Sequence, residues 1–263
     1  MSGHSKWAKI KRAKGANDVK RGAIFTKLGR NIILAVKEGG TDPNSNFALR
    51  MEIDKAKAVN MPSDNIERSI KKGAGGDEKA SVQRVTYEAV THGGVNVLVD
   101  CKTDNTNRTV SEIKKILEQG GAKLGSMGSV SWQFNEFGLI VLRPAKLKKA
   151  EKYGGLDTYA PVEVETVEME LMEIEGITDI VESDSEDEEG NSFKVLEVYT
   201  DKNSFSKVHK AIEALQYQMV SFELIKKAKD LVEVSPEVVE KVEHLIEILD
   251  DQEDVDSVWT NLK

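Results

Sequence analysis

The residues best suited to chemistry lie at the start of the chain, where basic side chains surround a tryptophan. Lysine and arginine neutralise phosphates and bind nucleic acids without reading their sequence, and a tryptophan can stack on an unpaired base. A solvated, disordered terminus, with Trp7 packed on the first folded domain, is the alternative. The candidate nucleic-acid-binding residues of this arm are His4, Lys6, Trp7, Lys9, Lys11, Arg12 and Lys14.

The basic character continues beyond the arm. Apolar residues at helical spacing from Ile24 to Val36 predict a helix, and its cations fall on a different arc from its apolar residues. A further helix, opened by Pro62-Ser63-Asp64, is predicted to end in two lysines. The predicted interface therefore also includes Lys20, Arg21, Lys27, Arg30, Lys71 and Lys72.

A second polar cluster opens the helix that is predicted after Thr103. The N-termini of helices attract anions, and an arginine there would add charge. Ordinary capping of the helix is the alternative role. The candidate residues for a second nucleic-acid contact are Asn105, Asn107 and Arg108.

Patterns typical of catalysis or metal binding are missing from the sequence. The four histidines have no metal-ligand spacing, and no serine-nucleophile elbow is present. The single cysteine, Cys101, excludes an internal disulfide framework. Gly73-Ala74-Gly75-Gly76 lacks the Lys-Ser/Thr pair of a phosphate-binding loop. We therefore expect a protein that is not an enzyme and that holds no metal and no cofactor.

Charge is distributed unevenly along the 263 residues, whose formal net charge is −8. Residues 1–80 hold 17 basic and 9 acidic side chains, whereas residues 81–263 hold 20 and 36. Such asymmetry favours an anionic partner for the basic part. Residues 163–189 carry 13 acidic and no basic side chains, and the run 182–189 is predicted to be a solvated loop. Repulsion of nucleic acid, or binding of a basic protein, is the alternative role of this run.

Changes in hydrophobic period divide the chain. Helical spacing dominates residues 1–76, and strand alternation mixed with helices follows. The expected fold class is α+β, with a small helical domain followed by two ferredoxin-like domains, the third inserted in the second. The expected domains are 1–76, 77–137 with 227–263, and 138–226, the last with the acidic loop.

Hydropathy also predicts a location for the protein. No apolar run approaches the length of a transmembrane helix, and the N-terminus has no apolar signal-peptide core. We expect a cytoplasmic protein with no membrane partner.

Several motifs, taken together and in order, resemble the YebC/PmpR family. They are Gly3-His4-Ser5-Lys6-Trp7, Lys20-Arg21-Gly22 with Phe25-Thr26-Lys27-Leu28, Met61-Pro62-Ser63-Asp64-Asn65-Ile66-Glu67-Arg68, Thr103-Asp104-Asn105 with Asn107-Arg108-Thr109, and Gly128-Ser129-Val130. The match departs from the family pattern after Tyr87-Glu88, where a Gly- and Pro-rich turn is usual, and in a longer, more acidic stretch over 144–192.

The resemblance implies a helical N-terminal domain and two α+β domains. Members of the family are described as probable DNA-binding transcriptional regulators of the cytoplasm. Relatives, including the mitochondrial translational activator of cytochrome c oxidase, act in translation on the ribosome.

Three functions follow from these observations. The first is a DNA-binding transcriptional regulator, as the resemblance implies. The second is a ribosome-associated translation factor that binds ribosomal or transfer RNA, which a basic arm with one tryptophan suits. The third is a protein-interaction scaffold whose arm meets an acidic protein.

Overall fold

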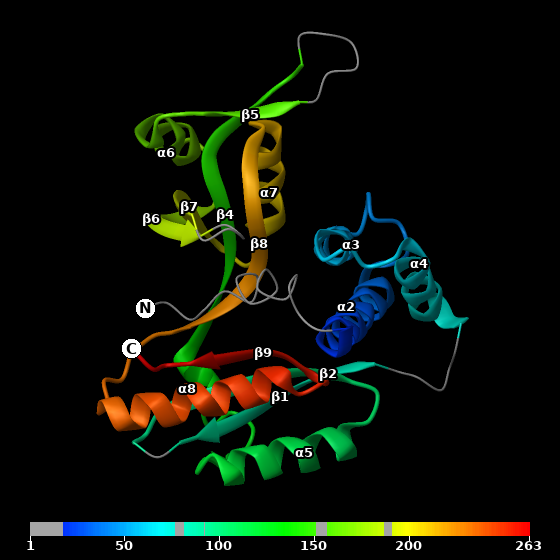
Figure 1. Ribbon diagram of the computed structural model, residues 1–263, viewed down its shortest axis with the longest axis vertical. Coiled ribbons are helices and arrows are strands. Elements are labelled where there is room, and N and C mark those ends of the chain that lie inside the picture. The colour runs from blue at the N-terminus through cyan, green and yellow to red at the C-terminus, as the bar shows by residue number, and fades with distance from the viewer. Residues whose placement is uncertain (1–17, 77–81, 92, 151–156, 187–190) are drawn as a thin grey trace. The chain divides into compact units, whose positions relative to one another are not determined.

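The computed structural model describes residues 18–76, 82–91, 93–150, 157–186 and 191–263 (Figure 1). The chain divides into two compact units, one within residues 1–135 and 227–263 and the other formed by residues 136–226. Each unit is described separately below. None of the helices in the described ranges is long and apolar enough to cross a membrane.

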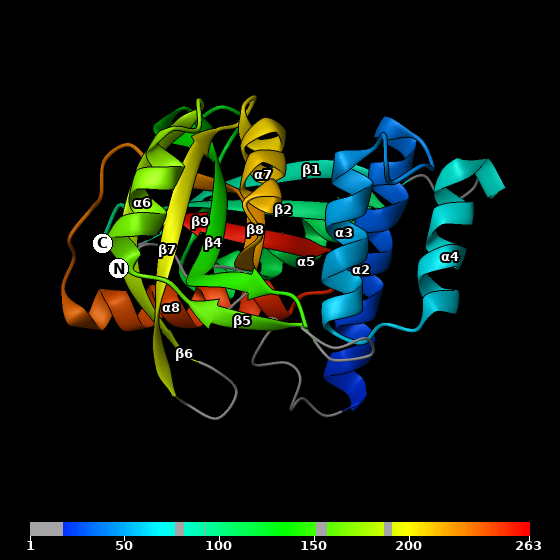
Figure 2. The same cartoon turned by 90° about the horizontal axis from the view of Figure 1, so that it is seen from above.

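The first unit begins with a helical region. It contains α2 (Asp18–Gly39), α3 (Phe47–Ala58), α4 (Ser63–Lys71) and a short π-helical turn, η2 (Lys72–Gly76). Helices α2 and α3 lie side by side in both views (Figures 1 and 2). Asn46 joins them, because its side chain caps α3 by accepting from the Leu49 amide and donates to the Ala35 carbonyl. A small core, including Ile32, Leu49 and Ile66, closes between the helices.

A four-stranded sheet forms the rest of the first unit. Its order is β3-β1-β2-β9, and the neighbouring strands run antiparallel. The elements of this part are β1 (Gln83–Val90), β2 (Asn96–Thr103), α5 (Thr106–Gln119), β3 (Lys123–Leu124), the 3-10 turn η3 (Ser131–Gln133), α8 (Pro236–Asp251) and β9 (Val255–Thr260).

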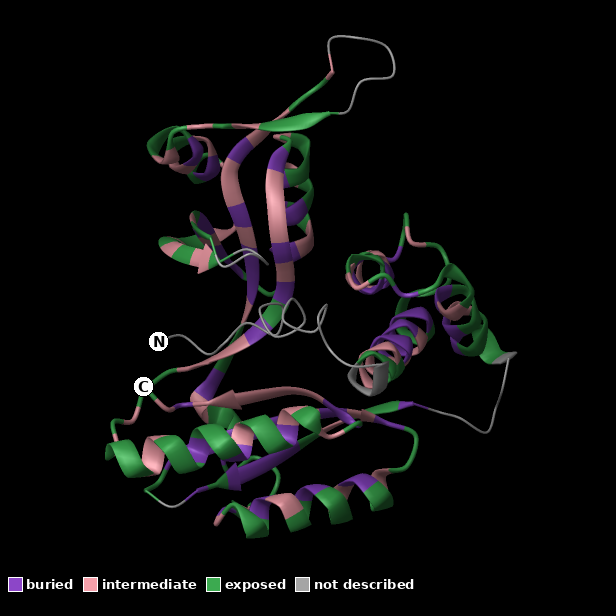
Figure 3. Cartoon of the chain, viewed as in Figure 1, coloured by how far each residue is buried: buried purple, intermediate pink, exposed green. Residues whose placement is uncertain are grey.

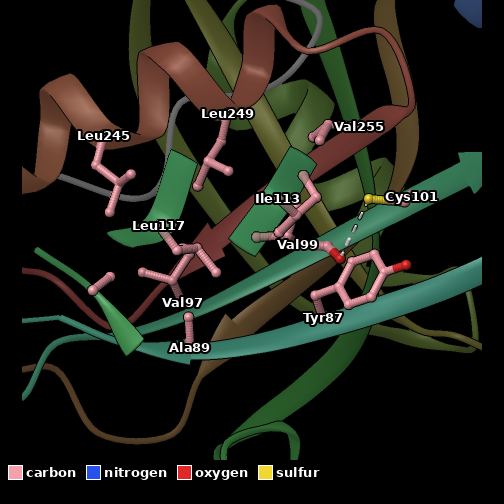
Figure 4. Close-up of a cluster of buried hydrophobic side chains, with 11 residues drawn as sticks. Tyr87, Ala89, Val97, Val99, Cys101, Ile113, Leu117, Leu245, Leu249 and Val255 are labelled. Atoms are coloured by element: carbon pink, nitrogen blue, oxygen red, sulfur yellow. Dashed lines mark hydrogen bonds between the residues drawn. The ribbon is translucent and has the colours of Figure 1, made fainter. Parts of the chain in front are cut away.

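Helices α5 and α8 cover one face of this sheet. Ile113 and Leu117 of α5, with Leu245 and Leu249 of α8, point toward Val97, Val99 and their neighbours on the strands (Figure 4). Helix α8 comes from the end of the chain, so residues far apart in sequence share one core. The helices approach closely because residue 120 is glycine; a Cβ there would lie 2.6 Å from Leu245 Cδ1.

A smaller cluster lies on another part of the sheet. It contains Leu98, Val130 and Phe134, with Trp259 and Ala228 packed against it. The indole Nε1 of Trp259 donates to Asp100 at 2.8 Å. Since Leu98 alternates with the residues of the α5–α8 core along β2, this cluster occupies the opposite face.

Within its described residues, the second unit is a five-stranded sheet with two helices. Strands β6, β7, β4 and β5 are adjacent in that order, and β8 pairs with β4. Without β5 the connectivity is βαββαβ with the order β8-β4-β7-β6, the ferredoxin-like arrangement. The elements are β4 (Phe134–Lys148, which begins in the first unit), β5 (Thr158–Pro161), α6 (Val164–Met172), β6 (Ile177–Glu186), β7 (Ser192–Asp201), α7 (Phe205–Ala214) and β8 (Tyr217–Ala228).

The prediction of a solvated acidic loop over 182–189 is wrong for its first part. Residues 182–186 continue β6 and pair with β7, while 187–190 lie outside the described residues. Lys194 on β7 explains how the strand tolerates its charge: its Nζ lies 2.9 Å from Glu182 and 3.1 Å from Asp184. Strand β6 is at the sheet edge, where charged side chains also discourage pairing with another chain.

The predicted fold class is confirmed: a helical region precedes mixed α+β structure with antiparallel sheets. Figure 3 shows buried positions concentrated on the strands and the inner sides of the helices, while the outer sides of α5 and α8 are exposed. The boundaries of the three expected domains stay a prediction.

Candidate nucleic-acid interface

The arm lies outside the described residues. This applies to His4, Lys6, Trp7, Lys9, Lys11, Arg12 and Lys14, and Lys20 is described only as part of the α2 backbone. The described structure therefore begins with the first turn of α2, directly after the arm.

The central cations of α2 contact the C-terminal segment of the first unit. The Lys27 ammonium donates to the Asp250 carbonyl. Arg30 donates to the carbonyl and carboxylate of Glu253, at 2.9 and 3.0 Å, and lies 2.9 Å from Asp254 Oδ1. The Arg30 side chain is 12% exposed. The cations at the centre of α2 therefore bind groups inside the protein, because an acidic segment from near the other end of the chain contacts this part of the helix.

Asp254 is the centre of this contact. Its side chain is 1% exposed and accepts from Arg108 at 2.9 and 3.0 Å, from the Thr109 hydroxyl at 2.7 Å and from Thr103 at 3.2 Å. Burial opposes its ionisation, but the bonds from Arg108 and Thr109 and the charge of Arg30 outweigh it, so the pKa of Asp254 is lowered. Sequence reasoning missed Asp254, since one acid in an acidic tail gives no distinguishing signal.

The cluster at the start of α5 is a helix cap and an ion pair. The Asn105 side chain accepts from the Arg108 amide at 3.1 Å, which confirms capping. The Arg108 side chain is 41% exposed, pairing with Asp254 and Asp104, and these bonds raise its pKa, the Asp254 bond contributing most. Asn107 is exposed. A nucleic-acid contact by these residues stays a prediction.

Three further cations of the expected interface, Arg21, Lys71 and Lys72, are exposed. Arg21 lies in the first part of α2, Lys71 ends α4, and Lys72 begins η2. The exposed Arg68 lies one turn before Lys72, although sequence reasoning did not select it. Gly73 lets this turn pack on α2, because a Cβ there would lie 2.7 Å from Val36 Cβ. The structure thus gathers Arg68, Lys71 and Lys72 at one end of α4.

A loop that sequence reasoning did not select also has a distinct geometry. Residues 125–133, here called the Glu88 loop, surround the Glu88 carboxylate on β1. That carboxylate accepts from the amides of Gly128, Val130 and Ser131 at 2.5–2.9 Å. Desolvation opposes ionisation of Glu88, but these amides outweigh it, so its pKa is lowered. A Gly/Ser-rich segment that contains Met127 and Trp132 is the signal that was available in the sequence.

Within the described residues, no three His, Cys, Asp or Glu side chains are grouped to hold a metal ion. Cys101 is buried in β2, and desolvation strongly raises the pKa of its thiol. A thiol with a raised pKa is a poor nucleophile.

Comparison with known proteins gives consistent matches along the chain. The model of the TACO1/YebC protein N-terminal domain matches residues 5–76, and that of the TACO1/YebC second and third domain matches residues 82–262. A probable transcriptional regulatory protein of Bacillus licheniformis is 38% identical, with 100% of both chains covered. One from Borrelia garinii is 43% identical, with 100% of this chain and 98% of the relative covered.

A solved structure is similar as well. The crystal structure of a conserved hypothetical protein from Aquifex aeolicus has a TM-score of 0.74 and 33% identity, and the match covers 94% of this chain and 91% of that one. Since the family models and these relatives span nearly the whole sequence, the chain belongs to the TACO1/YebC family.

Proposed function

We propose that this chain is a non-enzymatic, nucleic-acid-binding regulator of gene expression that acts on DNA in the cytoplasm. One observation carries the proposal: 17 of the 37 lysines and arginines lie in residues 1–80, while the rest of the chain is strongly acidic. Relatives that carry the name probable transcriptional regulatory protein support the regulatory role.

The proposed contact joins the arm to the exposed cations of the helical region. Arg21, Arg68, Lys71 and Lys72 are exposed, so phosphates can reach them. Lys27 and Arg30 are excluded from this contact, because they are engaged with residues 250–254. Phosphate contacts of this kind give affinity and orientation without sequence reading.

A second candidate function is a ribosome-associated translation factor that binds ribosomal or transfer RNA. The internal contacts of α2 favour it, because a helix whose central cations are engaged is poorly placed to read a DNA groove. The single tryptophan of the arm also suits unpaired bases of folded RNA.

Salt titration of binding tests the proposal. The probes are a 30-base-pair DNA duplex and a transfer RNA, and the variant replaces Lys9, Lys11, Arg12 and Lys14 by Gln. If the arm contacts phosphates, affinity falls and the log–log salt slope decreases by about 0.7–0.9 for each lost contact.

The matched control removes four exposed lysines from elsewhere, Lys114, Lys115, Lys207 and Lys210, by the same change to Gln. It has the same net charge as the arm variant but should keep the salt slope. Equal slopes for wild type and the arm variant would contradict the proposal and favour an acidic protein as the arm's partner.

In-cell crosslinking followed by sequencing separates the two candidates. Reads concentrated at promoters support the DNA regulator. Reads concentrated in ribosomal or transfer RNA support the translation factor and contradict the action on DNA.

A further inference from the structure

The Glu88 loop presents two large apolar side chains to solvent. Met127 is 93% exposed, and Trp132 is 62% exposed. The neighbouring Val130 and Phe134 are buried under the sheet, so the same segment has an inner and an outer apolar side. Exposed apolar groups held in one place mark a contact surface.

The loop is held in this shape before any partner arrives. Three backbone amides bind the Glu88 carboxylate, and the Gly125 amide donates to the Glu88 carbonyl at 2.7 Å. Gly125 leaves room for the Ser129 hydroxyl, since a Cβ would lie 2.6 Å from it, and Gly128 has a φ of +85°. A rigid loop loses little entropy on binding.

The chemistry around Trp132 determines which partner fits. Its indole Nε1 donates to the Ser129 carbonyl at 3.1 Å, so a partner meets the ring rather than its donor. The Lys229 ammonium donates to the Trp132 carbonyl at 2.6 Å, and Lys123 is exposed four residues before Met127. Asp230 is the exposed acid beside Lys229, and the Glu88 carboxylate is directed inward. An exposed aromatic ring with a lysine bonded to its backbone carbonyl has the two components of a single-strand platform, a stacking surface and a cation for the phosphates.

We propose that the Glu88 loop stacks an unpaired nucleobase on Trp132, with Lys229 near a flanking phosphate and the exposed Met127 as a further apolar contact of the same loop. This inference rests on the proposed function, because it takes nucleic acid as the ligand. It adds a second binding surface and names unpaired bases as the part of the nucleic acid that this surface binds. Stacking on a ring is tolerant of base identity, so the contact selects unpaired over paired bases and not one sequence over another.

The test compares Trp132→Ala, Trp132→Phe and Met127→Ala with wild type. The probes are a mixed-sequence 20-nucleotide single-stranded RNA, the same sequence as single-stranded DNA, and its DNA duplex. We expect Trp132→Ala to weaken binding of both single strands about fivefold to a hundredfold, with little effect on the duplex. Trp132→Phe should retain most of the affinity because a ring remains, and Met127→Ala should show a smaller loss.

The control is Ile248→Ala, which removes an exposed apolar side chain from α8, on the other side of the sheet. Circular dichroism and the thermal unfolding midpoint check that each variant is folded. If Trp132→Ala fails to fold, Trp132→Phe and Trp132→Leu replace it, because they differ in aromaticity at similar bulk.

Two results overturn the inference. One is an unchanged affinity of Trp132→Ala for the single strands, which leaves an apolar protein as the loop's partner. The other is an equal loss on single strands and duplex. Failure of wild type to bind any of the three probes contradicts the proposed function instead, so the two failures are distinguishable.

Discussion

Asp254 and Glu88 are both buried carboxylates of the first unit, and their partners differ in kind. Asp254 is bound by the side chains of Arg30, Arg108 and Thr109, which come from α2 and α5. Glu88 is bound by successive backbone amides of one loop. One acid therefore joins separate elements, while the other shapes a single segment.

The difference shows what each acid contributes to the candidate interface. Asp254 lies 224 positions after Arg30, and it converts a cation of the predicted interface into an internal contact. The bonds of Glu88 instead hold a loop in place, and Met127 and Trp132 of that loop remain exposed to solvent. Hence two buried carboxylates act differently: one binds a cation of the predicted interface, and the other holds a loop whose apolar side chains are exposed.

Replacing Asp254 should have the largest effect. Asp254→Ala removes the buried carboxylate beside Arg30, which keeps only its bonds to the exposed Glu253. Breaking a buried pair costs about 3 kcal/mol of unfolding free energy, and part of this is regained because Arg30 keeps Glu253 and Arg108 can reach water. Urea unfolding followed by circular dichroism measures the loss. Hydrogen exchange should show faster opening of α2, with the Glu88 loop unchanged.

The matched control for Asp254 is Asp251→Ala, which removes an exposed acid three residues away and should leave the unfolding midpoint unchanged. Equal effects of the two substitutions would show that the acidity of the segment, rather than the buried pair, holds α2.

Replacing Glu88 should have the next largest effect. Glu88→Gln keeps the shape but removes the charge that three amides bind, and a hydrogen bond to a charged group contributes about 1.5–3 kcal/mol. We expect a loss of about 2 kcal/mol, with faster exchange in residues 125–133 only. Glu240→Gln, at an exposed position of α8, is the control. Faster exchange in α2 would contradict the local role of Glu88.

Acid should weaken both contacts. The pKa values of Asp254 and Glu88 in the folded chain lie below the ordinary 3.8 and 4.5. The unfolded chain takes up these protons first as pH falls, so the stability they add is present above about pH 4.5 and is lost below it. At pH 4 the loss is smaller than that caused by either substitution, because the lowered pKa values keep part of each carboxylate ionised in the folded chain. Urea midpoints at pH 7 and pH 4 measure it.

The double variant Asp254→Asn with Glu88→Gln is the comparison for the pH prediction. Its unfolding midpoint should depend less on pH than that of wild type. An identical dependence would assign the acid sensitivity to other carboxylates.

Removing the cap of α5 should have the smallest effect. Asn105→Ala loses the bond to the Arg108 amide, and such a cap contributes about 1 kcal/mol. Asn107→Ala is the control, because Asn107 is exposed two residues later. Thermal unfolding of both variants measures the difference. A nucleic-acid affinity that falls with Asn107→Ala at unchanged stability would support the second contact.

Local patterns predicted most of the fold. The apolar spacing in α2, the alternation in β1 and β2, and the capping signal at Asn105 depend on neighbours in sequence, and the structure confirms them. One prediction was wrong, and it concerns charge: residues 182–186 of the acidic run form strand, where Lys194 on β7 pairs with Glu182 and Asp184. Local patterns also gave no sign that the cations at the centre of α2 contact residues 250–254.

The sequence alone determined the family resemblance, the order of helices and strands, and the concentration of cations in residues 1–80. Only the tertiary structure decided that Arg30 and Arg108 share a buried acid and that Met127 and Trp132 remain outside. The physical reason is that helix periodicity and capping arise between residues a few positions apart. Burial and ion pairing arise between residues that only the folded chain brings together.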